Sequence, residues 1–188
     1  MANFNSFIDK LDMEFWYEIC AKNGELCHYK KGEFFVQQGD VIRCMGIVQE
    51  GYFKYVTTDS SGNEHITGLA LPGTFVGDYL STTQKTPCMT SIVAATNVEV
   101  LVCNCEIVNE LFNEDRELHQ LFSDLLFHDC YIQYLDMHRL SPKERYIALL
   151  KRCPDILQNI SIKEIASYLN VTPTYLSRIR KEITFENK

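Results

Sequence analysis

Two different hydrophobic periods divide the chain. Up to about residue 104, short apolar segments alternate with turn residues, and all nine glycines lie in this part, between Gly24 and Gly77. Glycine suits tight turns between short strands, so this part is predicted to be a barrel or roll of antiparallel strands. From Glu106 the apolar residues recur with a helical period. The pattern therefore predicts an α+β protein, with a β-rich first part followed by helices.

Turn residues mark where the strands of the first part begin and end. The predicted strands are 34–36, 45–48, 52–58, 65–71, 91–95 and 98–103, with Gly, Asp, Asn or Pro between them. Residues 5–22 precede the strands and have apolar groups at helical spacing. With Asn5 or Ser6 as a candidate cap, this segment predicts an N-terminal helix.

A long helix is predicted over roughly 114–139, after a short one near 106–112. Apolar residues recur in it every seven positions in two rows, which are Leu111, Leu118, Leu125 and Ile132, and Leu121, His128 and Leu135. Two rows at this spacing form the seam of a coiled coil, so we expect the helix to pair with a second copy, with His128 as a polar interruption. The alternative is that the stripe packs on the chain's own β domain.

The most specific motif lies near the C-terminus. The capping boxes Ser141-Pro142-Lys143-Glu144 and Ser161-Ile162-Lys163-Glu164 predict helices from 142 to about 152 and from 162 to about 169, joined by a connector over 155–160. Asn170 then suits a left-handed turn, and Thr172 caps a last helix. Two short helices joined in this way form a helix-turn-helix, whose second helix can enter a DNA major groove.

The last helix is predicted to present a polar and basic face. Its candidate DNA-binding residues are Thr172, Thr174, Tyr175, Ser177, Arg178 and Lys181. Arginine can form two parallel hydrogen bonds with guanine, so Arg178 is expected to read bases, while hydroxyls and lysine suit phosphates or variable base contacts. The alternative is a helical hairpin used only for packing.

Charge divides the chain at nearly the same place. The whole chain has a formal net charge of −7, but residues 1–138 hold 8 Lys and Arg against 20 Asp and Glu. Residues 139–188 hold 10 Lys and Arg against 5 Asp and Glu. A basic segment on an acidic body favours double-stranded DNA as a partner, with chance clustering on solvated helices as the alternative.

From about Leu26 to Ile183 the chain resembles the Crp–Fnr family of transcription regulators. The matching features, in order, are Gly32, Gly39-Asp40, Gly51, Pro72-Gly73, Val76-Gly77-Asp78, the heptad helix and the helix-turn-helix. The resemblance implies a cyclic-nucleotide-binding-like sensor roll over 1–112, a dimerisation helix over 113–140 and a DNA-binding domain over 141–188. It also implies a homodimer on a palindromic site and RNA polymerase as a further partner. Relatives continue into a winged-helix hairpin, so a truncated wing is expected before Lys188.

The resemblance places an effector pocket in the roll. Its residues here are Gly77, Asp78, Cys88, Met89 and Thr90, and the pocket is expected to be lined by residues 77–90 and by the long helix. Members that bind a cyclic nucleotide have a Gly-Glu pair and a phosphate-binding arginine, whereas here Gly77-Asp78 stands at the pair and Cys88 at the arginine position. A buried phosphate without a guanidinium partner is costly, so we expect no ligand or one other than cyclic AMP, and the sequence names no cofactor. The alternative function is a cyclic-AMP-binding signalling module whose C-terminal helices bind a protein.

Other chemistry is not expected. Phosphate-binding loops, dinucleotide-binding motifs, zinc-protease helices and nucleophile elbows do not occur, so we expect no enzyme and no metal. Cys20 and Cys27 alone do not make a four-cysteine iron–sulfur pattern. Cys103 and Cys105 are predicted to share one strand face, where packing is favoured over a redox or metal role. His128 follows Asp124 by one turn, and a polar contact in the seam is favoured over metal binding for this pair. The absence of long apolar runs and of a secretion signal predicts a cytoplasmic protein with reduced thiols and no membrane partner.

Overall fold

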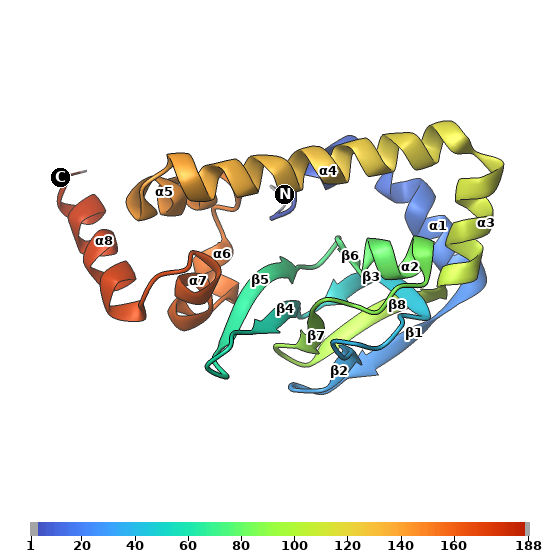
Figure 1. Cartoon of the computed structure of the whole chain (residues 1–188), viewed down its shortest axis with the longest axis horizontal. Helices are drawn as coiled ribbons and strands as arrows, with labels where there is room; N and C mark the ends of the chain where they lie inside the picture. The colour runs from blue at the N-terminus through green and yellow to red at the C-terminus, as the bar shows by residue number, and fades with distance from the viewer. Residues whose placement is uncertain (1–3, 187–188) are drawn as a thin grey trace.

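The computed structural model describes residues 4–186, with side chains up to residue 184. A β-roll of two sheets lies beneath one long helix, and a group of shorter helices adjoins one end of the roll (Figure 1). The expected α+β architecture is confirmed. None of the helices in the described part of the chain is long and apolar enough to cross a membrane.

Two four-stranded antiparallel sheets form the roll. The first has the order β1 (Gly24–Tyr29), β8 (Val98–Asn104), β3 (Cys44–Glu50) and β6 (Phe75–Val76). The second has the order β2 (Phe34–Val36), β7 (Ser91–Ala94), β4 (Phe53–Thr58) and β5 (Glu64–Ala70). Side chains from both sheets meet in one core that contains the fully buried Val48, Phe53 and Val100. Strand β5 is an edge strand of the second sheet, so one side of it is free to meet other elements.

The N-terminal part differs from the prediction of one helix over 5–22. A short 3-10 helix, η1 (Ser6–Lys10), is followed by α1 (Met13–Asn23). The chain turns between them because the Asp12 carboxylate caps α1, accepting a 3.0 Å hydrogen bond from the amide of Phe15. Strand β1 follows α1 directly and pairs with β8 along its whole length, although the sequence pattern predicts no strand there.

The remaining helices follow the predicted pattern closely. They are α3 (Cys105–Glu114), α4 (Arg116–Arg139), α5 (Pro142–Arg152), α7 (Ile162–Tyr168) and α8 (Pro173–Glu186). Both predicted capping boxes form, at Ser141 with Glu144 and at Ser161 with Glu164. Two further short helices, α2 (Tyr79–Gln84) and α6 (Ile156–Asn159), have too few residues to show a period, and α6 lies in the predicted connector.

The prediction that Cys103 and Cys105 share a strand face is wrong. Strand β8 ends at Asn104, whose side chain accepts a hydrogen bond from the amide of Glu106 and caps α3. Cys103 packs under α1, with its sulfur 3.2 Å from that of Cys20, whereas Cys105 lies in the roll core beside Thr82. Among the described residues, no three His, Cys, Asp or Glu side chains gather in a way that could hold a metal ion.

The C-terminal helices and the roll share one apolar core. Tyr52, Ile66 and Leu69 of the roll belong to the same buried cluster as Ile165 and Leu176 of the helix-turn-helix. The long helix α4 packs on the other end of the roll. There the buried ring of Phe122 contacts the rings of Trp16 in α1 and Phe112 in α3. The helix-turn-helix is therefore held directly against the sensor as well as through α4 (Figure 1).

Candidate nucleic-acid interface and effector cavity

The turn between α7 and α8 has the geometry predicted from the sequence. Asn170 has a φ of 54°, in the left-handed region, and the amide of Val171 donates to the carbonyl of Ala166 at 2.9 Å. Thr172 Oγ1 accepts a 3.2 Å hydrogen bond from the amide of Tyr175, which caps α8. These local bonds fix the angle at which α8 leaves the turn.

Buried residues lock α7 and α8 together and leave the outer face of α8 in solvent. The locking residues Ile165, Ala166, Leu176 and Ile179 are all buried. All six residues predicted for DNA binding are exposed, namely Thr172, Thr174, Tyr175, Ser177, Arg178 and Lys181, and Pro173, Glu182 and Thr184 are exposed as well. Arg178 and Lys181 form no ion pair with any side chain that the structure describes, so their charges face water. Arg180, in contrast, is half-buried and contacts Tyr146, where burial raises the tyrosine pKa and the arginine lowers it.

The two heptad rows of α4 face different surroundings. Leu118 and Leu125 pack against the chain's own sensor cluster, as the alternative interpretation expected. In the second row Leu121 is 48% exposed and His128 is also exposed, whereas Leu135 is half-buried, so this row faces solvent at its first two positions. The exposed face of α4 also carries aromatic residues that the heptad rows do not include. One of them, Phe127, is 69% exposed, and its ring stacks on that of Tyr131 with the ring centroids 5.8 Å apart.

A cavity of about 250 Å³ lies between the roll, α4 and the N-terminal segment. Gly77 and Asp78, which the sequence predicts for an effector pocket, both line it. Cys88, Met89 and Thr90 lie outside its lining, since Cys88 is buried in the roll core and Met89 is 67% exposed. Two of the five predicted pocket residues therefore line the cavity, and the other three do not.

The long helix was expected to line the pocket and does so, but strands β4 and β5 and the N-terminal segment, which the sequence did not assign to the pocket, also form part of the wall. Strands β4 and β5 supply Tyr55 and Thr67, the long helix supplies Phe122 and Leu126, and the N-terminal segment supplies Phe4. These residues lie far apart along the chain and meet only because α4 crosses the roll. No sequence signal marks them beyond their apolar or aromatic character.

Polar groups at one end of the cavity are bonded to one another. The hydroxyl of Tyr55 donates to the carbonyl of Gly77 at 3.0 Å and accepts from the amide of Gly77 at 3.2 Å. Burial raises the Tyr55 pKa to about 12, so this phenol is neutral. The Asp78 carboxylate caps α2 by accepting a 2.8 Å hydrogen bond from the amide of Ser81. A carboxylate thus occupies the place at which an anionic ligand would approach the helix.

The N-terminal segment crosses the cavity and reaches the helix-turn-helix. Asn5 Nδ2 donates to the carbonyl of Leu69 at 3.3 Å, and the Ser6 hydroxyl donates to the Asp129 carboxylate of α4. Phe4 is buried and packs edge-on against Tyr168 of α7, with ring centroids 4.9 Å apart. Residues 4–6 therefore form a strap, the N-terminal strap, that contacts β5, α4 and α7 together.

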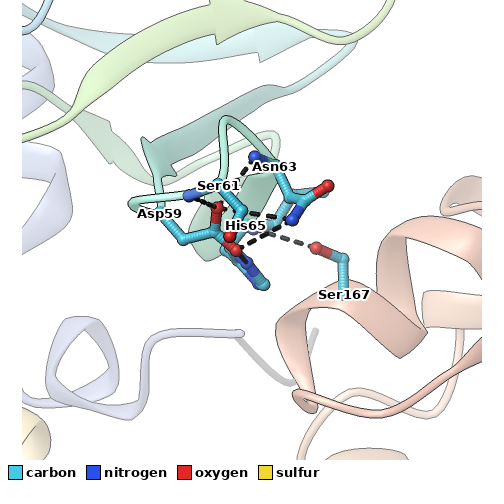
Figure 2. Close-up of polar contacts among 6 residues, drawn as sticks. Asp59, Ser61, Asn63, His65 and Ser167 are labelled. Atoms are coloured by element: carbon cyan, nitrogen blue, oxygen red, sulfur yellow. Dashed lines mark hydrogen bonds and ion pairs between the residues drawn. The ribbon is translucent and has the colours of Figure 1, made fainter.

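Hydrogen bonds also tie the helix-turn-helix to the edge of the sensor sheet. The amide of Ile66 in β5 donates to Ser167 Oγ at 3.0 Å, and the Tyr52 hydroxyl donates to Glu164 at 3.0 Å. Figure 2 shows Ser167 reaching towards the hairpin between β4 and β5, where Asp59 organises the loop. The orientation of α7, and so of α8, depends on contacts with the sensor.

Known proteins are similar to this chain in the sequence of the roll and in the fold of the whole chain. Residues 26–115 match the family model of the cyclic nucleotide-binding domain. The transcriptional activator protein Anr of Pseudomonas protegens is 34% identical over 103 residues, which are 55% of this chain and 38% of Anr. The chain thus spans less than half the length of the curated relatives it matches.

Solved structures extend the similarity beyond the roll. FixK2 from Bradyrhizobium japonicum has a TM-score of 0.76 at 16% identity, over 87% of this chain and 86% of that one. The catabolite activator protein of Thermus thermophilus has a TM-score of 0.58 at 21% identity, over 96% of this chain and 87% of that one. By sequence, residues 26–115 therefore match the cyclic nucleotide-binding domain, and Crp–Fnr-type regulators are homologues and structural neighbours of this chain.

Proposed function

We propose that this protein is a DNA-binding transcription regulator that acts as a homodimer. The observation that carries the proposal is the outer face of α8, where Arg178, Lys181 and four hydroxyl-bearing residues are exposed and no described ion pair uses the two cations. A recognition helix needs this arrangement, because bases are read by side chains that are free before DNA arrives. We assign Arg178 to base reading and the other five residues to phosphates or assisting base contacts.

The solvent-facing side of α4 supports the dimer. Leu121, Phe127 and Tyr131 are large and exposed, and the rings of Phe127 and Tyr131 stack with centroids 5.8 Å apart. Isolated apolar side chains on a surface need no explanation, but the exposed Leu121, Phe127, Tyr131, Tyr134 and Met137 on one 24-residue helix favour a second copy as its partner. Two copies joined along α4 would each present an α8, which suits a palindromic site.

The effector of this regulator is proposed to be a molecule other than cyclic AMP. None of the described residues that line the cavity is a lysine or an arginine, and Asp78 stands at its polar end. A cyclic phosphate buried there would lack a charge-assisted partner. The same observation disfavours a cyclic-AMP signalling module. We expect the regulator to act in the cytoplasm and to contact RNA polymerase, both of which the Crp–Fnr resemblance implies.

Selection of genomic DNA fragments by the full chain tests this function. The protein is incubated with sheared genomic DNA, with and without cyclic AMP, and the bound fragments are sequenced. We expect the same palindromic site to be enriched in both samples. Fragments without a shared motif would contradict the proposed regulator, and a motif that appears only with cyclic AMP would contradict the proposal about the effector.

A further inference from the structure

We propose that the cavity between the roll, α4 and the N-terminal strap binds a small, uncharged and largely apolar molecule. This inference rests on the proposed function, because it names the class of effector for the regulator described above. Three features of the cavity carry it: the composition of its wall, the bonding of its polar groups, and its size.

The wall of the cavity is mainly aromatic and aliphatic. Its apolar residues include Phe4, Phe7, Tyr55, Phe75, Phe112 and Phe122. Among the described residues of the lining, the only acidic or basic side chains are those of Asp78 and Asp129. An anion in this cavity would meet two carboxylates and no cation, and its desolvation would be uncompensated.

The two carboxylates do not call for a cationic ligand, because both already have partners. Asp78 accepts the amide hydrogen of Ser81 at 2.8 Å, at the N-terminus of α2. Asp129 accepts hydrogen bonds from Gln133 Nε2, at 2.9 Å, and from the Ser6 hydroxyl. A cation would have to compete with these bonds, whereas an uncharged molecule leaves them in place.

The uncharged polar groups of the wall are bonded to the protein as well. The Tyr55 hydroxyl is held by both backbone groups of Gly77, and the carbonyl of Thr82 accepts a 2.8 Å hydrogen bond from Asn109. With these groups paired, the surface offered to a ligand is mostly carbon. Transfer of apolar area from water to such a surface is worth roughly 25 cal/mol per Å².

The size of the cavity limits the ligand to a compact molecule. Its volume of about 250 Å³ is slightly below the range of roughly 300–1,000 Å³ that is typical of small-molecule pockets. One to three aromatic rings, or a short branched chain, fit such a space. The apolar wall and the small volume together point to a compact hydrophobic effector.

A fluorescence titration of the full chain with N-phenyl-1-naphthylamine tests the inference. This probe is neutral, compact and aromatic, and its emission rises in an apolar site. We expect saturable binding in the micromolar range, with no displacement by cyclic AMP at about 1 mM. An absence of saturable binding, or displacement of the probe by cyclic AMP, would overturn the inference.

Two variants show whether the probe occupies this cavity. Leu126→Trp fills it from α4 and is expected to weaken probe binding at least tenfold, by roughly 1.4 kcal/mol. Tyr17→Trp adds the same side chain at an exposed position of α1 and is expected to leave binding unchanged. Equal affinities in the two variants would place the probe elsewhere and refute the inference.

A third variant and a DNA assay complete the design. If Leu126→Trp does not fold, as judged by circular dichroism, Gly68→Leu fills the cavity from β5, where an added Cβ would lie at ordinary contact distance from the Tyr55 ring. The same protein samples are assayed for binding to duplex DNA. Duplex binding without probe binding overturns only the effector class, whereas probe binding without duplex binding overturns only the proposed function.

Discussion

The backbone amide of Ile66 donates a 3.0 Å hydrogen bond to Oγ of Ser167, and this bond joins the sensor sheet to the helix-turn-helix. Ile66 lies in the edge strand β5, whose outer side has no further strand to pair with, while Ser167 lies in α7 (Figure 2). An unpaired amide at a sheet edge is a free donor. Here Ser167 of the helix-turn-helix accepts the hydrogen bond of this amide. The sensor roll and the helix-turn-helix are therefore coupled through the backbone of the sheet.

Replacement of Ser167 by alanine is expected to weaken this junction. The variant removes the acceptor and leaves the partly buried Ile66 amide unpaired, at a cost of about 1 kcal/mol. Amide hydrogen exchange at Ile66 should therefore become roughly fivefold faster. Ser177→Ala is the matched control, because the Ser177 hydroxyl bonds only to the carbonyl of Pro173 in its own helix. Equal exchange rates at Ile66 in both variants would show that the bond does not hold the junction.

Loss of the Phe4 ring is expected to weaken the docking of the helix-turn-helix on the sensor, because Phe4 belongs to the N-terminal strap that contacts both. Phe4 is buried between Tyr168 and the guanidinium of Arg152, whose central carbon lies 5.0 Å from the ring centroid. Phe4→Ala should lower the free energy of unfolding by about 3 kcal/mol. Chemical denaturation measures this change, with Phe34→Ala, an exposed phenylalanine of β2, as the control. A loss no larger than that of the control would mean that the N-terminal strap contributes nothing to the docking.

The pKa of Asp59 is expected to lie well below its ordinary value of 3.8. Hydrogen bonds from His65, and from Asn63 and Ser61, stabilise the ionised carboxylate (Figure 2). Because the pKa is depressed in the folded state, these bonds stabilise the hairpin fully above the unfolded pKa, and this contribution is lost as the pH falls through the folded value.

Titration of the Asp59 carboxyl carbon by NMR measures this shift. In His65→Ala the strongest of the three contributions is removed, so the pKa should rise towards 3.8. A pKa near 3.8 in the unmodified protein, or no change on removal of His65, would contradict the hydrogen-bonded loop.

A charge on the exposed row of α4 is expected to separate the dimer. Leu121→Glu places two carboxylates in the proposed interface, and their burial should weaken dimerisation at least a hundredfold, by roughly 2.8 kcal/mol. Leu157→Glu makes the same change at an exposed leucine of α6 and should leave the dimer intact. Sedimentation equilibrium distinguishes the outcomes. A Leu121→Glu variant that remains fully dimeric would place the interface elsewhere.

The helix-turn-helix could be predicted in detail because its signals are local. Ser161 and Glu164 form a capping box within four residues, and Asn170 takes a left-handed φ that few other residues adopt. The two short helices need no distant partner to define where they begin and end. The same holds for the boundaries of α4 and for most strands of the roll.

The effector cavity could be predicted only in part, at Gly77 and Asp78 and along the long helix. Its wall joins Phe4, Tyr55 and Leu126, which are brought together only when α4 packs across the roll. The heptad rows of α4 were likewise ambiguous, because spacing alone cannot tell that Leu118 faces the sensor while Leu121 faces solvent. When one face of a long helix packs on its own domain and the opposite face is exposed, the heptad spacing does not show which face is which. The tertiary structure is needed to assign them.

Fluorescence anisotropy with Arg178→Ala tests the reading of DNA by α8 most directly. The full chain and the variant are titrated onto the selected duplex and onto a scrambled duplex at several salt concentrations. We expect the full chain to prefer the selected site, and the variant, still dimeric, to lose about 1–3 kcal/mol of that preference for each half-site. Lys22→Ala, on the distant α1, should keep it. A variant as selective as the unmodified protein would contradict the assignment of Arg178 and α8 to sequence recognition.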